Sequence, residues 1–177
     1  MPALDNYLTL VGRVDELCGR TTSSLASHIS CTPGCDSCCR HLSIFAVEAA
    51  ALRLALAGLS AAEAEVIRAS AEESTPDGHC PLLKDGLCLL YGARPIICRT
   101  HGLPLLIARE GEQEVDFCPR NFQELESIPG SAVIDLERLN AVLAAINALY
   151  LQSSPGPERV TIADAILGPR EEPDSVA

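Results

Sequence analysis

Apolar side chains recur at helical spacing in several separate stretches of the chain. Near the N-terminus they repeat every three to four residues, which predicts an amphipathic helix. Four further stretches show the same rhythm, and turn-forming residues or breaks in the pattern separate them. The predicted helices cover residues 3–29, 43–58, 60–73, 134–151 and 161–167. Helix is therefore the main element of the fold.

The start of the third predicted helix carries a local signal. Ser60 precedes it and Glu63 follows three positions later, which is the capping-box pattern that satisfies unpaired N–H groups at a helix start. Gly58 separates this helix from the one before it. We expect the helices at 43–58 and 60–73 to form an αα-hairpin whose alanine-rich surfaces approach each other closely.

Two stretches break the helical pattern. Residues 31–40 contain a proline, a glycine and four cysteines, and residues 79–102 contain several turn formers that exclude any long helix or strand. Further along, residues 103–109 and 112–117 read as two strands joined around Glu110-Gly111, which predicts a β-hairpin.

These elements give a fold that is mainly α with a small β-hairpin. At 177 residues the chain fits one domain, which we place at residues 1–168 with a cysteine-cluster core at 31–118. Residues 169–177 are expected to form a flexible acidic tail. Because the core segment lacks periodicity, we expect a compact, metal-organised, cysteine-rich domain rather than one held by apolar packing alone.

Charge and compartment restrict the partners. The formal charge of −11 disfavours nucleic acid or an anionic membrane as the main partner. The first twenty residues lack the basic and apolar regions of a signal peptide, and no stretch approaches the roughly 18 apolar residues of a spanning helix. We therefore expect a cytoplasmic protein, in which grouped thiols stay reduced and bind metal more often than they form disulfides.

The cysteines carry the candidate chemistry. Eight of the nine fall between residues 31 and 118, whereas Cys18 stands alone and is expected to be a small buried hydrophobe. Spacings of two or three residues in a Pro-Gly loop allow thiolates to converge on one soft cation. Adjacent side chains diverge, so Cys38 and Cys39 are expected to serve two sites, or one site with a reserve thiol. The candidate metal ligands are Cys31, Cys35, Cys38, Cys39, Cys80, Cys88, Cys98 and Cys118.

Several cofactors fit eight thiols. Two zinc ions, a cubane 4Fe-4S cluster or a mixture all match the count. A four-thiolate zinc site has a formal charge of about −2. Arg94 and Arg99 are therefore candidates for donors to sulfur or for charge compensation, as are Arg40 and Arg120.

Other interpretations of these residues stay open. The neighbouring histidines could replace a thiolate, although exposed or hydrogen-bonded imidazoles are the simpler interpretation; they are His41, His79 and His101. The spacing Cys31-x3-Cys35-x2-Cys38 also occurs in radical S-adenosylmethionine enzymes, but their large partial α/β barrel has no counterpart in this pattern. A thiol redox switch that uses Cys38 or Cys39 is a third alternative.

Three motifs together resemble a known family. They are Cys35-Asp-Ser-Cys38-Cys39, the stretch from Cys80-Pro-Leu-Leu to Asp85-Gly-Leu-Cys88, and Tyr91-Gly-Ala-Arg94-Pro95-Ile-Ile-Cys98-Arg99. This combination resembles the CxxCxxCC or YkgJ-like cysteine-cluster family of zinc- or iron-chelating domains. One departure is that three residues, not two, separate Cys31 from Cys35.

The resemblance implies a protein that holds an iron–sulfur cluster or zinc through grouped thiolates. One branch of the family is similar to flagellin lysine methylases, so an iron–sulfur-dependent enzyme for electron transfer or protein methylation is the alternative. No Gly-rich nucleotide loop or catalytic triad accompanies the cysteines, and catalytic residues stay unassigned. For the third motif we favour a structural role, in which Pro95 fixes a turn, Tyr91 packs and Arg94 pairs with a carboxylate.

Overall fold

The elements of the fold alternate between long helices and very short strands. The computed structural model describes residues 2–32 and 34–168, about half of them helical. The helices are α1 (Pro2–Ser24), α2 (Ala46–Ala57), α3 (Ala61–Glu72), α4 (Ile96–Thr100), α5 (Leu136–Ser153) and α6 (Ile162–Leu167), with 3₁₀ turns η1 (Ala26–His28), η2 (Tyr91–Ala93) and η3 (Gly130–Ala132). The strands are β1 (Ser43–Phe45), β2 (Leu83–Lys84), β3 (Leu87–Cys88), β4 (Leu105–Arg109), β5 (Glu112–Asp116), β6 (Ile134–Asp135) and β7 (Arg159–Thr161).

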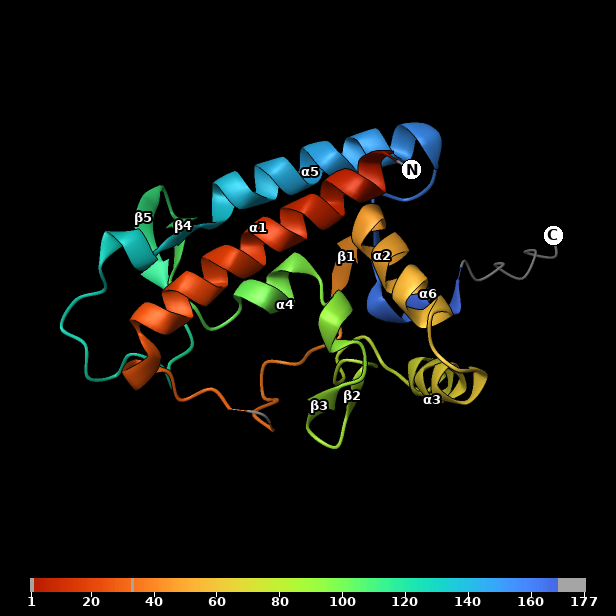
Figure 1. Ribbon diagram of the computed structural model, residues 1–177, viewed down its shortest axis with the longest axis horizontal. Helices are drawn as coiled ribbons and strands as arrows, with labels where there is room; N and C mark the ends of the chain where they lie inside the picture. Colours follow the sequence, from red (N-terminus) through yellow and green to blue (C-terminus); the bar gives the residue numbers. More distant parts are fainter. Residues whose placement is uncertain (1, 33, 169–177) are drawn as a thin grey trace.

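The two longest helices, α1 and α5, lie side by side and cover α2 and α4 (Figure 1). Their facing sides bury Tyr7 and Val14 of α1 against Leu143 and Tyr150 of α5. Val47 of α2 is also buried in this first core. Apolar burial of this kind is the main stabilising contribution to a helical layer.

A second core lies among α2, α3 and α6. It buries Leu52 from α2, Ile67 from α3, and Ile162 and Ala165 from α6. Both α2 and α3 contact α6 more extensively than they contact each other. The expected direct packing of an αα-hairpin is therefore wrong, because the C-terminal helix α6 returns to fill the space between the two helices.

Side-chain caps fix where two of these helices begin. The Ser60 hydroxyl accepts a hydrogen bond from the backbone N–H of Glu63 (3.3 Å), and the Glu63 carboxylate accepts one from the N–H of Ser60 (3.0 Å). At α6, the Thr161 hydroxyl accepts from the N–H of Asp164 (3.0 Å). Each cap satisfies N–H groups that the helix itself leaves unpaired.

The sheets are small and join distant parts of the chain. β4 and β5 form the antiparallel hairpin, with Glu110 (φ 54°) and Gly111 (φ 87°) at its turn, and β6 pairs in parallel with β4. β1 pairs with β7, so residues near 44 and 160 lie next to each other. β2 and β3 form a hairpin two residues long on each side.

Most of the predicted helices are confirmed, as are the 105–116 hairpin and the irregular 31–40 loop. The helical patterns at 43 and 134 each begin with a short strand, β1 and β6, before the helix starts. No described helix is both long and apolar enough to cross a lipid bilayer. The predicted tail at 169–177 lies outside the described residues, and the single-domain assignment stays a prediction.

Candidate metal centre

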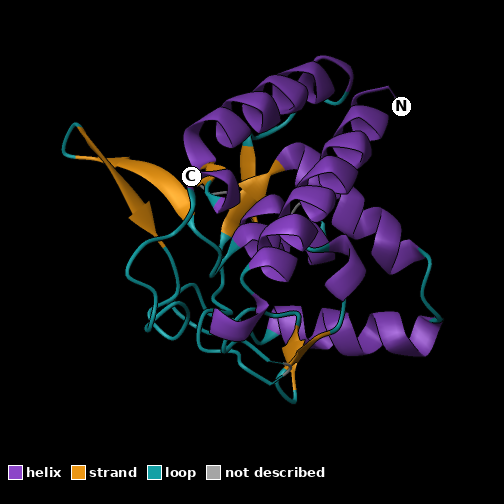
Figure 2. Ribbon diagram, turned by 60° about the vertical axis from the view of Figure 1, so that its left-hand side comes forward, coloured by secondary structure: helices purple, strands orange, loops and turns teal. Residues whose placement is uncertain are grey.

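Five separate segments carry the eight predicted ligands into the irregular part of the molecule. Figure 2 shows most of the loop structure gathered on one side of the helices. All nine cysteines are free thiols; Cys31 and Cys38 are exposed and the others are partly buried. The segments are the 31–39 loop with four cysteines, Cys80 before β2, Cys88 in β3, Cys98 in α4, and Cys118 after β5.

Direct backbone contact holds the 31–39 loop against the β2–β3 hairpin. The N–H of Cys80 donates to the carbonyl of Cys39 (3.0 Å). At the hairpin turn Gly86 has φ 75°, and a Cβ atom there would lie 3.2 Å from the Cα of Gly34. The left-handed conformation and the close approach both favour glycine at the turn. The backbones of the loop and the hairpin therefore meet directly, with no side chain between them at Gly34 and Gly86.

Four of the thiols form what we call the inner set: Cys39, Cys80, Cys88 and Cys98. Burial raises the pKa of Cys98 to about 12, and the neighbouring thiols of Cys80, Cys88 and Cys39 add to that rise. Burial likewise raises the pKa of Cys80 to about 11, with further contributions from Cys88 and Cys39. The thiols of Cys39, Cys80 and Cys88 thus all act on the pKa of Cys98, and the backbone hydrogen bond of Cys80 with Cys39 brings two of these segments together.

Backbone N–H groups act on two thiols of the inner set. The N–H of Leu82 lowers the pKa of Cys80, and the N–H of Leu90 lowers the pKa of Cys88, each partly offsetting the larger effect of burial. In both cases the donor lies two residues after the cysteine. A donor aimed at a sulfur favours the thiolate, which is the form that binds metal.

The other four thiols form the outer set: Cys31, Cys35, Cys38 and Cys118. Burial raises the pKa of Cys31, and the thiols of Cys35, Cys38 and Cys118 raise it further. Burial also raises the pKa of Cys38, with contributions from its sequence neighbour Cys39 and from Cys35. The thiols of Cys38 and Cys39 contact each other, so the expected divergence of these adjacent side chains is wrong, and their assignment to different sites stays a prediction.

Two side chains that the sequence analysis did not single out position these cysteines. Asn121 is 1% exposed; its side-chain amide donates to the carbonyl of Gly102 (2.8 Å) and accepts from the N–H of Ser30 (2.9 Å). This links the segments that carry Cys31 and Cys118. A lone asparagine in a loop gives no signal of such a role in the sequence.

The second positioning residue is Glu48, a buried carboxylate in α2. It accepts hydrogen bonds from the N–H of Ile96 (2.9 Å) and of Phe45 (3.0 Å), and so fixes the start of α4, which carries Cys98. Burial raises the pKa of Glu48, while these two N–H donors lower it.

Three of the four arginines near the cysteines differ in what they contact. Arg120 donates to the sulfur of Cys35 at 3.5 Å, as predicted for a donor to sulfur. The Arg94 guanidinium lies 3.5 Å from the ring centroid of Tyr91, and its charge is among the effects that lower the pKa of Cys88, against the larger rise from burial. We expected Arg94 to pair with a carboxylate. Among described residues, Arg99 makes such a pair and Arg94 does not. A role for Arg94 or Arg99 beside a bound metal stays a prediction.

Arg99 joins α4 to α1 and to the η2 turn. Its guanidinium donates to both carboxylate oxygens of Asp15 (2.7 and 2.8 Å), to the carbonyl of Arg94 (2.7 Å) and to that of Gly92 (2.5 Å). Tyr91 itself is exposed and does not pack in the core.

His41 is a structural link between three segments. Its Nδ1 lies 2.9 Å from the carbonyl of Thr75, and its Nε2 accepts from the N–H of Ala163 at 3.3 Å. Because both ring nitrogens contact backbone groups, His41 fits the interpretation of a hydrogen-bonded imidazole. Cys18 lies on α1 against the first core, as expected for a small apolar side chain.

The donor set fits a thiophilic metal, although the coordination shell is not already formed. Among residues 2–32 and 34–168, no three His, Cys, Asp or Glu side chains are arranged to hold a metal ion. The described thiols are nevertheless of the donor type that zinc and iron–sulfur clusters prefer. A metal-organised fold is therefore not shown by the structure.

Comparison with protein families decides the affiliation. A family described as "Putative zinc- or iron-chelating domain" matches residues 30–119, about half of the chain. The chain belongs to the CxxCxxCC family. The matched segment contains all eight candidate ligands and leaves out Cys18, and it supports metal binding in general terms. No curated protein and no solved structure matched the chain.

Proposed function

We propose that this protein binds metal at two four-thiolate sites, one formed by the inner set and one by the outer set, each holding zinc or an iron–sulfur cluster. The observation that carries the proposal is the way the cysteine-bearing segments meet: the N–H of Cys80 donates to the carbonyl of Cys39, and Arg120, two residues after Cys118, donates to the sulfur of Cys35. The thiols of Cys80, Cys88 and Cys39 raise the pKa of Cys98, whereas those of Cys35, Cys38 and Cys118 raise the pKa of Cys31.

The surroundings of each set support this division. The inner set has the Leu82 and Leu90 N–H donors and the positive charge of Arg94 nearby, and the outer set has the Arg120 contact with Cys35. Donors and positive charge of this kind offset the formal charge of about −2 on a four-thiolate zinc site. A reducing compartment such as the cytoplasm would keep all eight thiols available.

The test is anaerobic purification followed by elemental analysis and an absorption spectrum, with single substitutions in each set. Cys98→Ser should empty the inner site and Cys35→Ser the outer one, each lowering metal content by about half, and the double variant should bind none. Cys18→Ser is the matched control and should retain full metal content. If either single substitution removed all the metal, one shared site would replace the two proposed here.

The spectrum distinguishes the two cofactors. A broad band near 380–420 nm identifies an iron–sulfur cluster, and a colourless protein with stoichiometric zinc identifies thiolate zinc sites.

Electron transfer is the second candidate function, and the exposure of Cys31 and Cys38 favours it. A cluster with ligands at the surface lies close to any docked redox partner. Reversible bleaching of the visible band by dithionite would support this function, and an unchanged spectrum would exclude it.

A further inference from the structure

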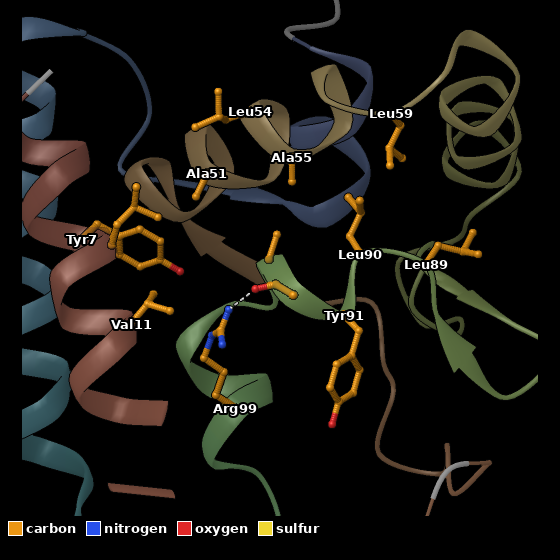
Figure 3. A pocket seen from close by; sticks show the side chains of 13 residues that line it. Tyr7, Val11, Ala51, Leu54, Ala55, Leu59, Leu89, Leu90, Tyr91 and Arg99 are labelled. Carbon is orange, nitrogen blue, oxygen red and sulfur yellow. Dashed lines mark hydrogen bonds between the residues drawn. The ribbon is translucent and has the colours of Figure 1, made fainter. Parts of the chain in front are cut away.

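A groove with no cysteine in its walls lies between α1, α2 and the segment that follows β3. Its volume is about 430 Å³, within the range of small-molecule sites. Figure 3 shows Ala51, Leu54 and Ala55 of α2 on one wall, with Leu90 opposite. The walls are almost entirely apolar.

One polar group is directed into this groove. Tyr7 is 1% exposed, and Figure 3 shows its hydroxyl pointing from α1 into the space beside Arg99. Within the described part of the chain, no hydrogen bond is made by this hydroxyl. Because no fully inaccessible polar side-chain atom there lacks a partner, the oxygen keeps a little accessible surface, and Tyr7 is one of the residues that line the groove. A buried donor left without an acceptor is unfavourable, so the site favours a ligand that supplies one.

The charges around the groove favour a neutral ligand. The Arg99 guanidinium is paired with Asp15 at 2.7 Å, so it is not free to attract an anion. The Arg94 guanidinium covers one face of the Tyr91 ring at 3.5 Å, which leaves that face unavailable to a ligand cation. Burial raises the pKa of Tyr7, and the nearby Glu48 charge raises it further, so the hydroxyl stays protonated and acts as a donor.

We infer that this groove binds a small uncharged organic molecule whose apolar body lies against α2 and Leu90 and whose carbonyl oxygen accepts a hydrogen bond from Tyr7. Two residues of the groove lie close in sequence to candidate ligands: Leu90 is two residues after Cys88, and Arg99 is one residue after Cys98.

The experiment compares two probes that differ by a carbonyl group, acetophenone and ethylbenzene, by ligand-observed NMR on the full chain. We expect acetophenone to bind with a Kd on the order of 1 mM, about fivefold more tightly than ethylbenzene. Tyr7→Phe should remove that difference while leaving the melting temperature unchanged or higher, because it deletes a donor that has no partner in the free protein.

A pair of surface variants tests the apolar wall without disturbing the core. Leu54 lines the groove and is 57% exposed, whereas Leu149 on α5 is 49% exposed and lies outside it. Leu54→Glu should weaken both probes at least fivefold, and Leu149→Glu should leave both affinities unchanged.

Four outcomes would overturn the inference: no binding of acetophenone, equal binding to Tyr7→Phe, loss of folding in Tyr7→Phe, or equal effects of the two leucine variants. Sedimentation supplies a fifth. If Leu54→Glu converted a dimer into a monomer, a second copy of the chain would be the occupant of the groove.

Discussion

The helical layers and the cysteine loops of this protein are held in place by different forces. In the layers, residues such as Leu52 and Ile67 are buried against each other from several helices. In the loops, Leu82 and Leu90 reach the second core, and much of the remaining chain is held by single contacts, such as Cys80 with Cys39 and Asn121 with Gly102. The difference teaches that the helices can fold by apolar burial, whereas the loops have fewer buried contacts and, under the proposal made above, would gain rigidity from a bound metal.

Removal of the metal should change amide hydrogen exchange in the cysteine loops far more than in the helical layers. Amide hydrogen exchange in residues 31–41 and 78–90 should accelerate by roughly a hundredfold after chelation, since those loops would lose their cross-link. Buried amides of α1 and α5 should change little. Uniform acceleration over the whole chain would show that the helical layers also depend on the metal.

The pH dependence of zinc binding should be steep. The pKa of Cys80 is raised to about 11 and that of Cys98 to about 12, so both thiols are protonated at neutral pH in the metal-free protein. Metal must displace those protons, so affinity rises with pH below these values and falls as the pH is lowered, by up to about 10,000-fold per pH unit for four protonated thiols.

Calorimetry in buffers of different ionisation enthalpy measures the number of protons released on binding. Cys18→Ser serves as the control and should release the same number. Binding without proton release would mean that the thiols of the sites are already ionised.

A core substitution tests the helical layers alone. Leu52→Ala removes a side chain with no exposed surface and should lower the free energy of unfolding by about 2–5 kcal/mol. The loss should be similar with metal bound and after chelation, because Leu52 supplies apolar packing and is not a candidate ligand, although Cys80 and Cys88 pack against the same core. Urea unfolding under both conditions provides the measurement, and a loss below about 1 kcal/mol would contradict the packing described.

A smaller effect is expected from Asn121, which links the loops of the outer set. Asn121→Ala leaves the Ser30 N–H and the Gly102 carbonyl without their partner and should cost about 1–3 kcal/mol. It should also weaken metal binding at the outer set more than at the inner set. Gln123→Ala is a matched control, since that exposed amide contacts only the nearby Pro119 carbonyl.

Local signals in the sequence predicted the local structure well. The capping box at Ser60 and Glu63 marked the start of α3, and Glu110-Gly111 marked the β4–β5 turn, because each depends on residues a few positions apart. The pairing of Ile44 with Val160 was not predictable, since it depends on how the chain returns after more than a hundred residues. The same reason hid the position of α6 between α2 and α3.

The candidate site shows the same limit. The eight candidate thiols could be picked out from their spacing, but the division into two sets proposed here could not, because it depends on which loops meet. The Gly34–Gly86 contact that brings the loop to the hairpin joins residues 52 positions apart. Glu48 and Asn121 gave no signal, because a single carboxylate or amide becomes a positioning group only through its tertiary neighbours.

The Arg99–Asp15 ion pair has a consequence for where this protein could be shortened. Asp15 belongs to α1, which lies wholly outside the segment shared with the family at 30–119. A fragment cut to residues 30–119 would lose Asp15, which pairs with Arg99 of α4. It would also lose the residues that α1 contributes to the first core. The segment shared with the family is therefore shorter than the part of the chain that packs together with it.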